Sequence, residues 1–305
     1  RRDVNYIGVG GCGRKILSEL VKRDMEKGVF HGTGYFFYDL SDDVDYVYDG
    51  IKGTNFLDVK PARFGGGAGR VPMSAEYITS NLSELFNYPP STFIPRIANI
   101  YLHSLGGGTG SGSVPMLIEN SKKSRGGGVH ITCSVFTEGS ILENANHLYT
   151  FKRCNEKADM VIVVENRAME KRIRELHPSI AGEMPLETIN DHIVNILDLV
   201  TAARKPGAYP GIQDFKNYVN HLATSPLYTH GIRWLVPVLW PQLGIGLERR
   251  YERYTPLGWI IRALKEGPIC EAVEVTKTEL VILILEAPFD GYLSNYDIDD
   301  TMRRV

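Results

Sequence analysis

The sequence contains no Gly-Lys-Ser or Gly-Lys-Thr step, so it lacks the lysine-bearing phosphate loop that many nucleoside triphosphatases use. Cys-x-x-Cys and His-Glu-x-x-His spacings are also absent, and we therefore expect no zinc site held by the protein. Neither of the two longest apolar stretches, 234–247 and 280–287, is long enough without interruption to span a bilayer. These absences argue against a Walker-type NTPase, a zinc enzyme and a transmembrane protein.

An excess of charge of one sign is missing as well. The sequence has 34 Lys and Arg against 36 Asp and Glu, for a formal net charge of −2. This balance gives no indication of a membrane-surface role, and we expect no direct nucleic-acid site. The four cysteines are scattered and no apolar signal segment is evident, so we expect a reducing, cytoplasmic location.

What the chain does have is a large apolar fraction, 43% of 305 residues, which is enough for a large core and two domains. From residue 4 to about 165 strands alternate with helices, which predicts a mostly parallel sheet covered on both faces. A long amphipathic helix follows, and Pro-Gly pairs at 206–207 and 210–211 interrupt the chain after it. The predicted class is α/β, with a Rossmann-like domain over 1–184, a central helix over 185–205, a smaller α+β domain over 206–288 and a tail over 289–305.

Apolar runs and breaker residues place the individual elements. Strands of the first domain are expected at 4–7, 35–38, 97–105, 129–135 and 160–164. Ser74 is expected to cap a helix, and Pro115 to lie in the first turn of the helix after the loop 106–112. Strands of the second domain are expected at 232–238, 272–275 and 280–286, with a helix at 257–264.

Two glycine-rich loops directly follow expected strands. The first, 8–13, has Gly-x-Gly-x-x-Gly spacing, a weak signal that a dinucleotide-binding domain would also give, with Asp39 as its ribose acid. The second, 106–112, is Gly-Gly-Gly-Thr-Gly-Ser-Gly. A loop this poor in side chains lets backbone N–H groups approach a ligand, and the positive end of the following helix favours phosphate. Further phosphate-binding hydroxyls are offered by Thr109, Ser111 and Ser113.

The second loop resembles the tubulin/FtsZ signature, and the presence of two phosphate loops favours that fold over a dinucleotide-binding one. The resemblance covers the first two-thirds of the chain and implies a GTPase that binds GTP or GDP with Mg²⁺. It implies a nucleotide-binding set made of Gly10, Gly11, Cys12, Gly13, Asp39, Gly67, Ala68, Gly69, Arg70, Gly106, Gly107, Gly108, Thr109, Gly110, Ser111, Glu138, Asn166, Leu186 and Asn190. Within this set Asp39 is implied to order Mg²⁺ through water, since hard oxygen ligands suit that ion.

The resemblance also implies how the base and ribose are held. Glu138 corresponds to the ribose-binding acid, and Asn166 and Asn190 correspond to the residues that recognise guanine. Leu186 stands where an aromatic residue normally stacks on the base, so the base is expected to be held by apolar contact. Two further departures are Arg70 in place of the third-loop asparagine and Leu142 in place of an arginine found in FtsZ proteins.

Catalysis in this family uses an acidic loop from the next subunit, and the matching segment here is 211–219. Asp214 takes the position of the acid that polarises the attacking water, while Gly211 replaces a second acid, so slower hydrolysis is expected. Without the family, Asp214 is explained as a helix N-cap. An active site completed by a neighbour implies a head-to-tail filament whose assembly switches hydrolysis on.

Segments 186–193 and 214–219 look most like phage tubulins (PhuZ-like), and 255–267 is similar to the plasmid-segregation tubulin TubZ. The resemblance therefore implies a prokaryotic or phage filament that positions or segregates DNA or phage particles, with an adaptor at the C-terminal tail. Three alternatives stay open: an FtsZ-like GTPase of cell division or cell shape, a filament-regulating pseudo-GTPase, and an NAD(P)-binding Rossmann oxidoreductase that uses 8–13 and Asp39.

Overall fold

The computed structural model describes residues 4–27, 34–41, 56–59, 67–86, 98–125, 128–180, 182–201 and 234–235. The strands form one seven-stranded sheet in the order β3-β2-β1-β4-β5-β6-β7, and all neighbouring pairs are parallel. The strands are β1 (Val4–Val9), β2 (Gly34–Tyr38), β3 (Phe56–Val59), β4 (Ala98–Ser104), β5 (Val129–Phe136), β6 (Met160–Glu165) and β7 (Trp234–Leu235). The helices are α1 (Gly10–Lys27), α2 (Pro72–Phe86), α3 (Thr109–Arg125), α4 (Ile141–Lys157), α5 (Asn166–Leu176) and α6 (Leu186–Thr201).

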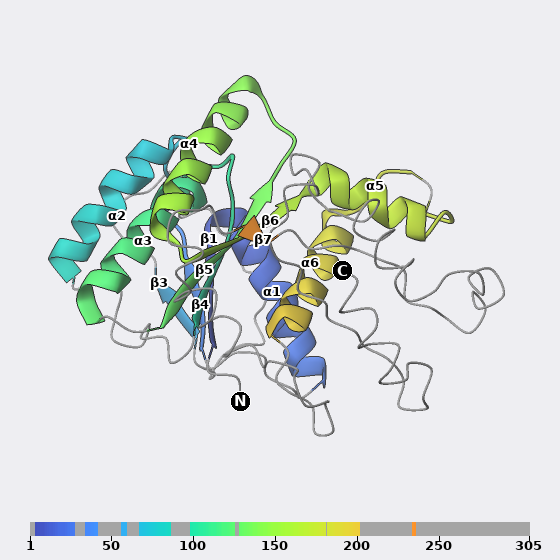
Figure 1. Cartoon of the computed structure of the whole chain (residues 1–305), viewed down its shortest axis with the longest axis horizontal. Helices are drawn as coiled ribbons and strands as arrows, with labels where there is room; N and C mark the ends of the chain where they lie inside the picture. The colour runs from blue at the N-terminus through green and yellow to red at the C-terminus, as the bar shows by residue number, and fades with distance from the viewer. Residues whose placement is uncertain are drawn as a thin grey trace, which may run out of the picture.

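Helices cover both faces of this sheet, which confirms the predicted Rossmann-like α/β fold class. Figure 1 shows α2, α3 and α4 on one side of the strands and α1 with α6 on the other. Each face has its own apolar core: one joins the sheet to α1, α5 and α6, and the other joins it to α2, α3 and α4. Because both faces are buried, the strands read as near-continuous apolar runs, and this is why sequence alone could locate them.

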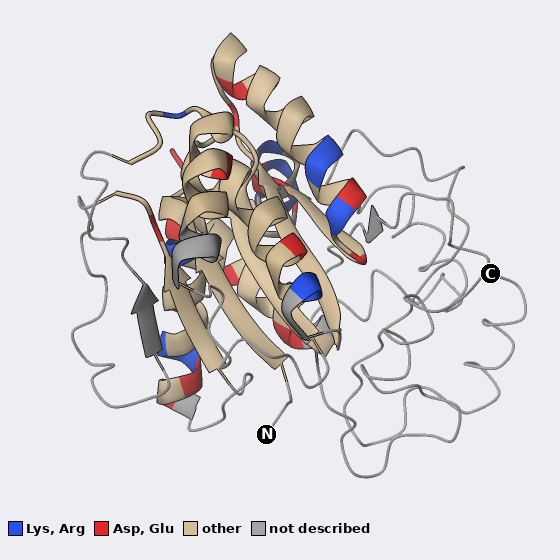
Figure 2. Ribbon diagram, turned by 90° about the vertical axis from the view of Figure 1, so that its left-hand side faces the viewer, with Lys and Arg blue, Asp and Glu red and all other residues tan. Residues whose placement is uncertain are grey.

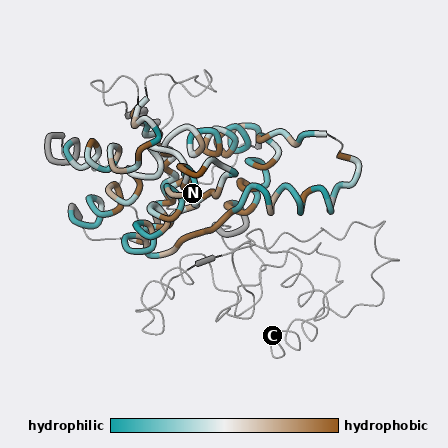
Figure 3. Tube along the Cα trace, turned by 90° about the horizontal axis from the view of Figure 1, so that it is seen from above, coloured by the Kyte–Doolittle hydropathy of each residue, from teal (hydrophilic) through white to brown (hydrophobic). Residues whose placement is uncertain are grey.

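The distribution of charge follows from this layering. Strands β1, β2, β4 and β5 contain no Asp, Glu, Lys or Arg. Figure 2 shows the charged residues of the described region mainly on the helices and loops around the tan sheet. In Figure 3 the apolar residues concentrate along the strands, whereas the helices alternate between apolar and polar positions. Among the described residues, no helix is both long and apolar enough to cross a bilayer.

The long helix α6 packs along α1. Arg23 of α1 donates a hydrogen bond to Asn195 of α6 at 2.6 Å and also pairs with Asp191. At the far end of α6, the Thr201 and Tyr6 hydroxyls form a buried hydrogen bond of 2.8 Å. The two helices therefore cover β1 together, and α6 is the central helix that the sequence predicted.

Three details differ from the sequence-based expectations. Helix α2 begins at Pro72, so Ser74 lies inside it and is not its cap. Helix α3 begins at Thr109, which places Pro115 inside the helix and not in its first turn. Strand β7 pairs with β6, so part of the expected strand 232–238 extends the first sheet. The domain boundaries themselves stay predictions, and the expected elements 257–264, 272–275 and 280–286 and the tail 289–305 lie outside the described residues.

Glycine makes the contact between α2 and α3 possible. A Cβ atom on Gly112 would lie 1.8 Å from the carbonyl oxygen of Pro72 and 2.9 Å from the Cβ of Ala75. The N-terminal turns of the two helices therefore meet backbone to backbone, and the residue at 112 cannot carry a side chain unless they separate.

Replacement of Gly112 by alanine is expected to destabilise the fold. Because the new methyl group would overlap the Pro72 carbonyl, Gly112→Ala should lower the free energy of unfolding by about 1–3 kcal/mol, measured by urea denaturation. The matched control is Gly11→Ala, because a Cβ atom at Gly11 meets no heavy atom within 4 Å. Equal stability of the two variants would contradict this account of the α2–α3 contact.

Candidate functional site

Parallel strands end at one edge of a sheet, and the glycine-rich loops gather at this carboxyl edge. A Cβ atom on Gly10, after β1, would lie 3.0 Å from the backbone nitrogen of Gly110 in the loop after β4. A Cβ atom on Gly108 would lie 3.0 Å from Ala68 and from the backbone of Arg70, in the turn that leads into α2. The structure thus brings together the first loop, the third loop (67–70) and the signature loop (106–112) as a surface made largely of backbone.

The first loop is short because α1 begins at Gly10, whose φ is +71°. A Cβ atom on Gly13 would lie 1.9 Å from the carbonyl oxygen of Leu102, so this glycine permits close packing of α1 on β4. Cys12 packs against the core, and burial raises the pKa of its thiol to about 12. The thiol is therefore neutral at physiological pH, and the groups that this loop offers to a ligand are the N–H groups at the start of α1.

The signature loop leads directly into α3. The Ser111 hydroxyl donates to the carbonyl oxygen of Leu105 at 2.8 Å, and the Ser113 hydroxyl accepts from Thr79 at 2.8 Å. Both serines are fully buried, so their hydroxyls hold the loop in shape and are not presented to a phosphate as the sequence suggested. Thr109 and Gly107 are half-buried, and the N–H groups in the first turn of α3 have the geometry that favours an anion.

Asp39, the residue expected to order the metal, lies just past β2. One of its carboxylate oxygens accepts from Arg14 at 3.3 Å, and the other accepts from the Ser41 backbone N–H at 3.2 Å. An ionised carboxylate has about four acceptor positions, so Asp39 keeps the capacity to hold a water of a Mg²⁺ shell. Arg14, directly after the first loop, brings a positive charge to this site that the sequence analysis did not assign.

The third loop adopts left-handed backbone at three positions, with φ of +71° at Gly67, +56° at Gly69 and +60° at Arg70. Glycine adopts this conformation readily, but for arginine it is strained. The Arg70 side chain is 72% exposed, and its guanidinium lies 3.8 Å from a carboxylate oxygen of Glu143. Its charge is thus held beside the loops, in contact with solvent.

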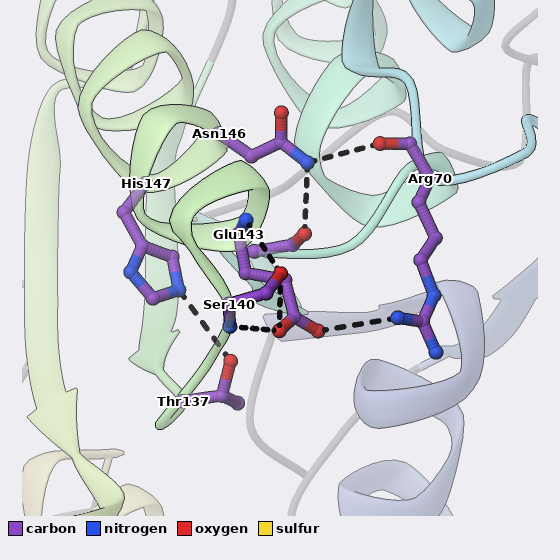
Figure 4. A network of polar contacts seen from close by, with 7 residues as sticks. Arg70, Thr137, Ser140, Glu143, Asn146 and His147 are labelled. Atoms are coloured by element: carbon purple, nitrogen blue, oxygen red, sulfur yellow. Dashed lines mark hydrogen bonds and ion pairs between the residues drawn. The ribbon is translucent and has the colours of Figure 1, made fainter.

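Helix α4 contacts this loop through two residues that the sequence analysis missed, Glu143 and Asn146 (Figure 4). Asn146 donates hydrogen bonds to the carbonyl oxygens of Arg70 at 2.9 Å and Gly106 at 3.0 Å. Glu143 completes a capping box with Ser140, and the hydrogen bond from the Ser140 backbone lowers the pKa of Glu143. The Ser-x-x-Glu spacing was visible in the sequence, whereas nothing local marks Asn146.

The expected ribose and base residues lie at neighbouring strand ends. Phe136 of β5 pairs with Glu165 of β6, so Glu138 and Asn166 follow adjacent strands at the carboxyl edge. The Glu138 carboxylate lies 3.6 Å from Nε of Arg167, and both side chains are more than 70% exposed, so their ion pair adds little stability. Asn166 is half-buried at the first position of α5.

Leu186 and Asn190 both lie near the start of α6. Leu186 is 52% exposed at its first position, and Asn190 is half-buried one turn later. Asp191, the next residue, pairs with Arg23, which fixes this turn against α1. The expected catalytic residue Asp214 and its neighbour Gly211 lie outside the described residues.

Comparison with known proteins agrees with this architecture. The family model "Tubulin/FtsZ family, GTPase domain" matches residues 3–174. Curated relatives include cell division protein FtsZ 1 of Pyrococcus abyssi, 28% identical over 208 residues, which are 67% of this chain and 51% of the relative. The FtsZ 1 of Archaeoglobus fulgidus is 23% identical over 202 residues, which are 65% and 51% of the two chains. The chain therefore spans about half the length of these relatives.

A solved structure shares the fold. The GTPγS-bound protofilament of CetZ2 from Haloferax volcanii matches with a TM-score of 0.50 and 19% sequence identity. The match covers 67% of this chain and 60% of CetZ2. At this identity the likeness concerns the fold alone.

A buried, neutral histidine lies just before the signature loop in the chain. His103, at the end of β4, is fully buried, and its Nε2 lies 2.9 Å from the Ser134 hydroxyl. Burial lowers the pKa of His103 from 6.5 to about 4. His130 on β5 shows the same change, from 6.5 to about 4, and burial is again the main cause.

The fold is accordingly expected to lose stability in acid. Between pH 6.5 and pH 4, His103 is protonated in the unfolded chain but stays neutral in the folded one. Protonation therefore stabilises the unfolded state, and the free energy of unfolding falls as the pH falls through this window. The full contribution of such a shift is about 3 kcal/mol. In urea unfolding at pH 7 to 4.5, His103→Asn should reduce the pH dependence of the free energy of unfolding. A slope unaltered by His103→Asn would contradict the assignment.

Proposed function

Because the chain belongs to the tubulin/FtsZ family, we propose that it binds and hydrolyses GTP and assembles head to tail into a filament. The observation that carries this proposal is the meeting of three backbone loops at the carboxyl edge of the sheet, with Gly10 against Gly110 and Gly108 against Arg70. Two helices, α1 and α3, begin at this meeting point, so their N-terminal N–H groups are available to the phosphates.

The negative charge of the phosphates is neutralised by three groups: Arg14, a Mg²⁺ ion whose water is held by Asp39, and the helix N-termini. Arg14 supplies a fixed positive charge in the absence of a phosphate-loop lysine, and its bond to Asp39 orients it. Magnesium, when bound with the nucleotide, supplies further neutralisation of the phosphate charge, and Asp39 is the residue that would hold its water. The left-handed turn at Gly67–Arg70 is placed to contact the terminal phosphate through its backbone.

Ribose and base extend from the phosphates toward β5, β6 and α6. We assign Glu138 to the ribose hydroxyls and Asn166 and Asn190 to the guanine edge, with Leu186 in apolar contact with the base. The exposure of Glu138 and Leu186 supports these roles, because both side chains are available to a ligand at this edge. The NAD-dependent alternative is not favoured, since the family model covers both glycine loops and Asp39.

The proposed active site is completed by Asp214 of a neighbouring subunit. The acid would accept a hydrogen bond from the attacking water and orient it toward the terminal phosphate, which is the main task a protein performs in this reaction. A head-to-tail contact that places segment 211–219 of one copy on the nucleotide of another does not close on itself, and therefore generates a filament. CetZ2, which shares the fold, was solved as a protofilament.

Exposed apolar side chains beside the loops support such a contact. Val71, Met73 and Tyr77 lie at the start of α2, and Ile141, Leu142 and Leu148 lie on the first turns of α4. Asn146 bonds the backbone of Arg70, so these two helix ends flank the same loop. Apolar residues gathered in this way are typical of a protein interface, and the occupant we propose is a second copy of this chain.

The cellular role rests on different evidence. The segments 186–193 and 214–219 support a phage or plasmid filament that positions DNA or phage particles through an adaptor. The FtsZ relatives support a second candidate, a filament of cell division. Both roles require the same polymerising GTPase.

Turnover should depend on protein concentration. Phosphate release from GTP is expected to rise cooperatively above a threshold that coincides with pelleting, because only assembled subunits have a complete site. Asp214→Ala should pellet with GTP but release phosphate about 100-fold more slowly, as expected for loss of a water-orienting acid.

A mixing experiment tests completion by the neighbour directly. Gly11→Asp adds a carboxylate at an open position of the first loop, where a Cβ atom meets no heavy atom within 4 Å, and is checked for loss of GTP binding. It retains Asp214, whereas Asp214→Ala retains the phosphate site. The phosphate-site variant alone should release no phosphate and Asp214→Ala alone only its residual amount, about 100-fold below the wild type, whereas the mixture should release more than either. Turnover that is linear in protein concentration and unaffected by Asp214→Ala would contradict the shared active site.

The apolar residues at the start of α4 give an independent test of assembly. Ile141 is 90% exposed, so Ile141→Lys should fold normally and bind GTP as a dilute monomer. Burial of its charge in the contact should raise the critical concentration for pelleting about tenfold or more. Met25→Lys, at an exposed apolar position near the end of α1, is the control and should assemble as the wild type. Unchanged assembly of Ile141→Lys would place the contact elsewhere.

A further inference from the structure

Asn146 joins two loops that are far apart in the sequence. Its side-chain nitrogen donates to the carbonyl oxygen of Arg70, 76 residues away, at 2.9 Å. It also donates to the carbonyl oxygen of Gly106, 40 residues away, at 3.0 Å. An amide nitrogen carries two hydrogens, so both are used, and the side chain is only 6% exposed. Asn146 is thus committed to holding the third loop against the signature loop.

The bond to Arg70 acts on a strained peptide. Arg70 has a φ of +60°, a conformation that costs a residue with a side chain about 1–2 kcal/mol. Such a conformation persists when neighbouring groups determine it, and here the neighbours are the Asn146 amide and the backbone of Gly108, which faces Arg70 without a side chain between them. Asn146 therefore keeps the third loop in a shape that the free loop would not favour.

Asn146 is itself fixed in place by the start of α4. The Glu143 carboxylate accepts from the Ser140 backbone N–H at 2.7 Å, which closes the capping box. Nε2 of His147 lies 3.4 Å from the Thr137 hydroxyl, and the centroid of the His147 ring lies 5.4 Å from that of the Phe136 ring. Figure 4 shows the Ser140–Glu143 and Thr137–His147 contacts beside Asn146 at the start of α4. The helix end is thus anchored to the loop after β5, and its position is passed on to the third loop.

We propose that Asn146 is a positioning residue that prepares the third loop for the terminal phosphate, and so sets the preference of the site for GTP over GDP. This inference rests on the proposed function, in which the third loop contacts the terminal phosphate that GDP lacks. A loop held in its binding shape before the ligand arrives loses less conformational freedom on binding. The loss of Asn146 would therefore weaken binding of the triphosphate and leave the diphosphate nearly unaffected.

The decisive variant is Asn146→Asp in the full chain. Aspartate has the same shape, but it places a carboxylate against two carbonyl oxygens and donates no hydrogen bond when ionised. We expect the dissociation constant for GTPγS, measured by titration below the assembly threshold, to rise about tenfold, and that for GDP to rise less than twofold. Asn144→Asp, the same change at an exposed position of the same helix, is the control and should alter neither constant.

The remaining outcomes separate this inference from the alternatives. An equal loss of GTPγS and GDP affinity, or an unchanged preference, overturns the positioning role. If Asn146→Asp shows no cooperative thermal unfolding, the same two dissociation constants are measured for Asn146→Ala. If neither variant folds, the role of Asn146 is structural, and the proposal is overturned. Wild-type protein that binds neither nucleotide would instead overturn the proposed function itself.

Discussion

At the carboxyl edge of the sheet, backbone packs directly on backbone, and most of the architecture follows from that contact. Gly13 lets α1 approach the Leu102 carbonyl, and Gly112 lets α3 approach the Pro72 carbonyl; in both cases an added Cβ would lie less than 2 Å from oxygen. Because no side chains intervene, the starts of α1 and α3 come close to one another and to the turn before α2. The same absence of side chains leaves the N–H groups at the starts of α1 and α3 without intervening side chains, so tight packing and the proposed phosphate site share a single constraint.

The electrostatics of the site follow from what this backbone surface lacks. A lysine placed in a phosphate loop would supply a mobile charge, whereas here the positive charges near the loops come from arginines with separate anchors. Arg14 is held by Asp39 and is mostly buried, while Arg70 is exposed beside Glu143. A buried, hydrogen-bonded charge is screened little by solvent and keeps its direction, but an exposed one contributes far less. Arg14 is therefore the stronger of the two candidates for phosphate neutralisation.

The sequence could predict whatever is encoded locally. Five strands were located because each is a buried apolar run, and both glycine loops because glycine spacing is visible in the chain. The predictions failed where a tertiary contact decides the outcome: α2 begins at Pro72 although Ser74 carries the better capping side chain, and Pro115 is accommodated inside α3. Asn146 could not be found, since its importance lies in two carbonyl groups 40 and 76 residues away. The pairing of short β7 with β6 could not be predicted, because pairing partners are not encoded in a strand's own residues.

Under the proposed function, the position of the exposed apolar residues would link assembly to the nucleotide. The starts of α2 and α4 carry these residues, and the third loop lies between the two helix ends, bonded to α4 through Asn146. A second copy that covers this surface must therefore contact elements whose positions are fixed by the same hydrogen bonds that shape the phosphate loops. If the third loop relaxes when the terminal phosphate is lost, the surface presented to the neighbour changes with it. A packed interface tolerates only small displacements, so even a small shift of the third loop would change the free energy of the contact. The contact would then depend on the nucleotide state without a large movement of any element.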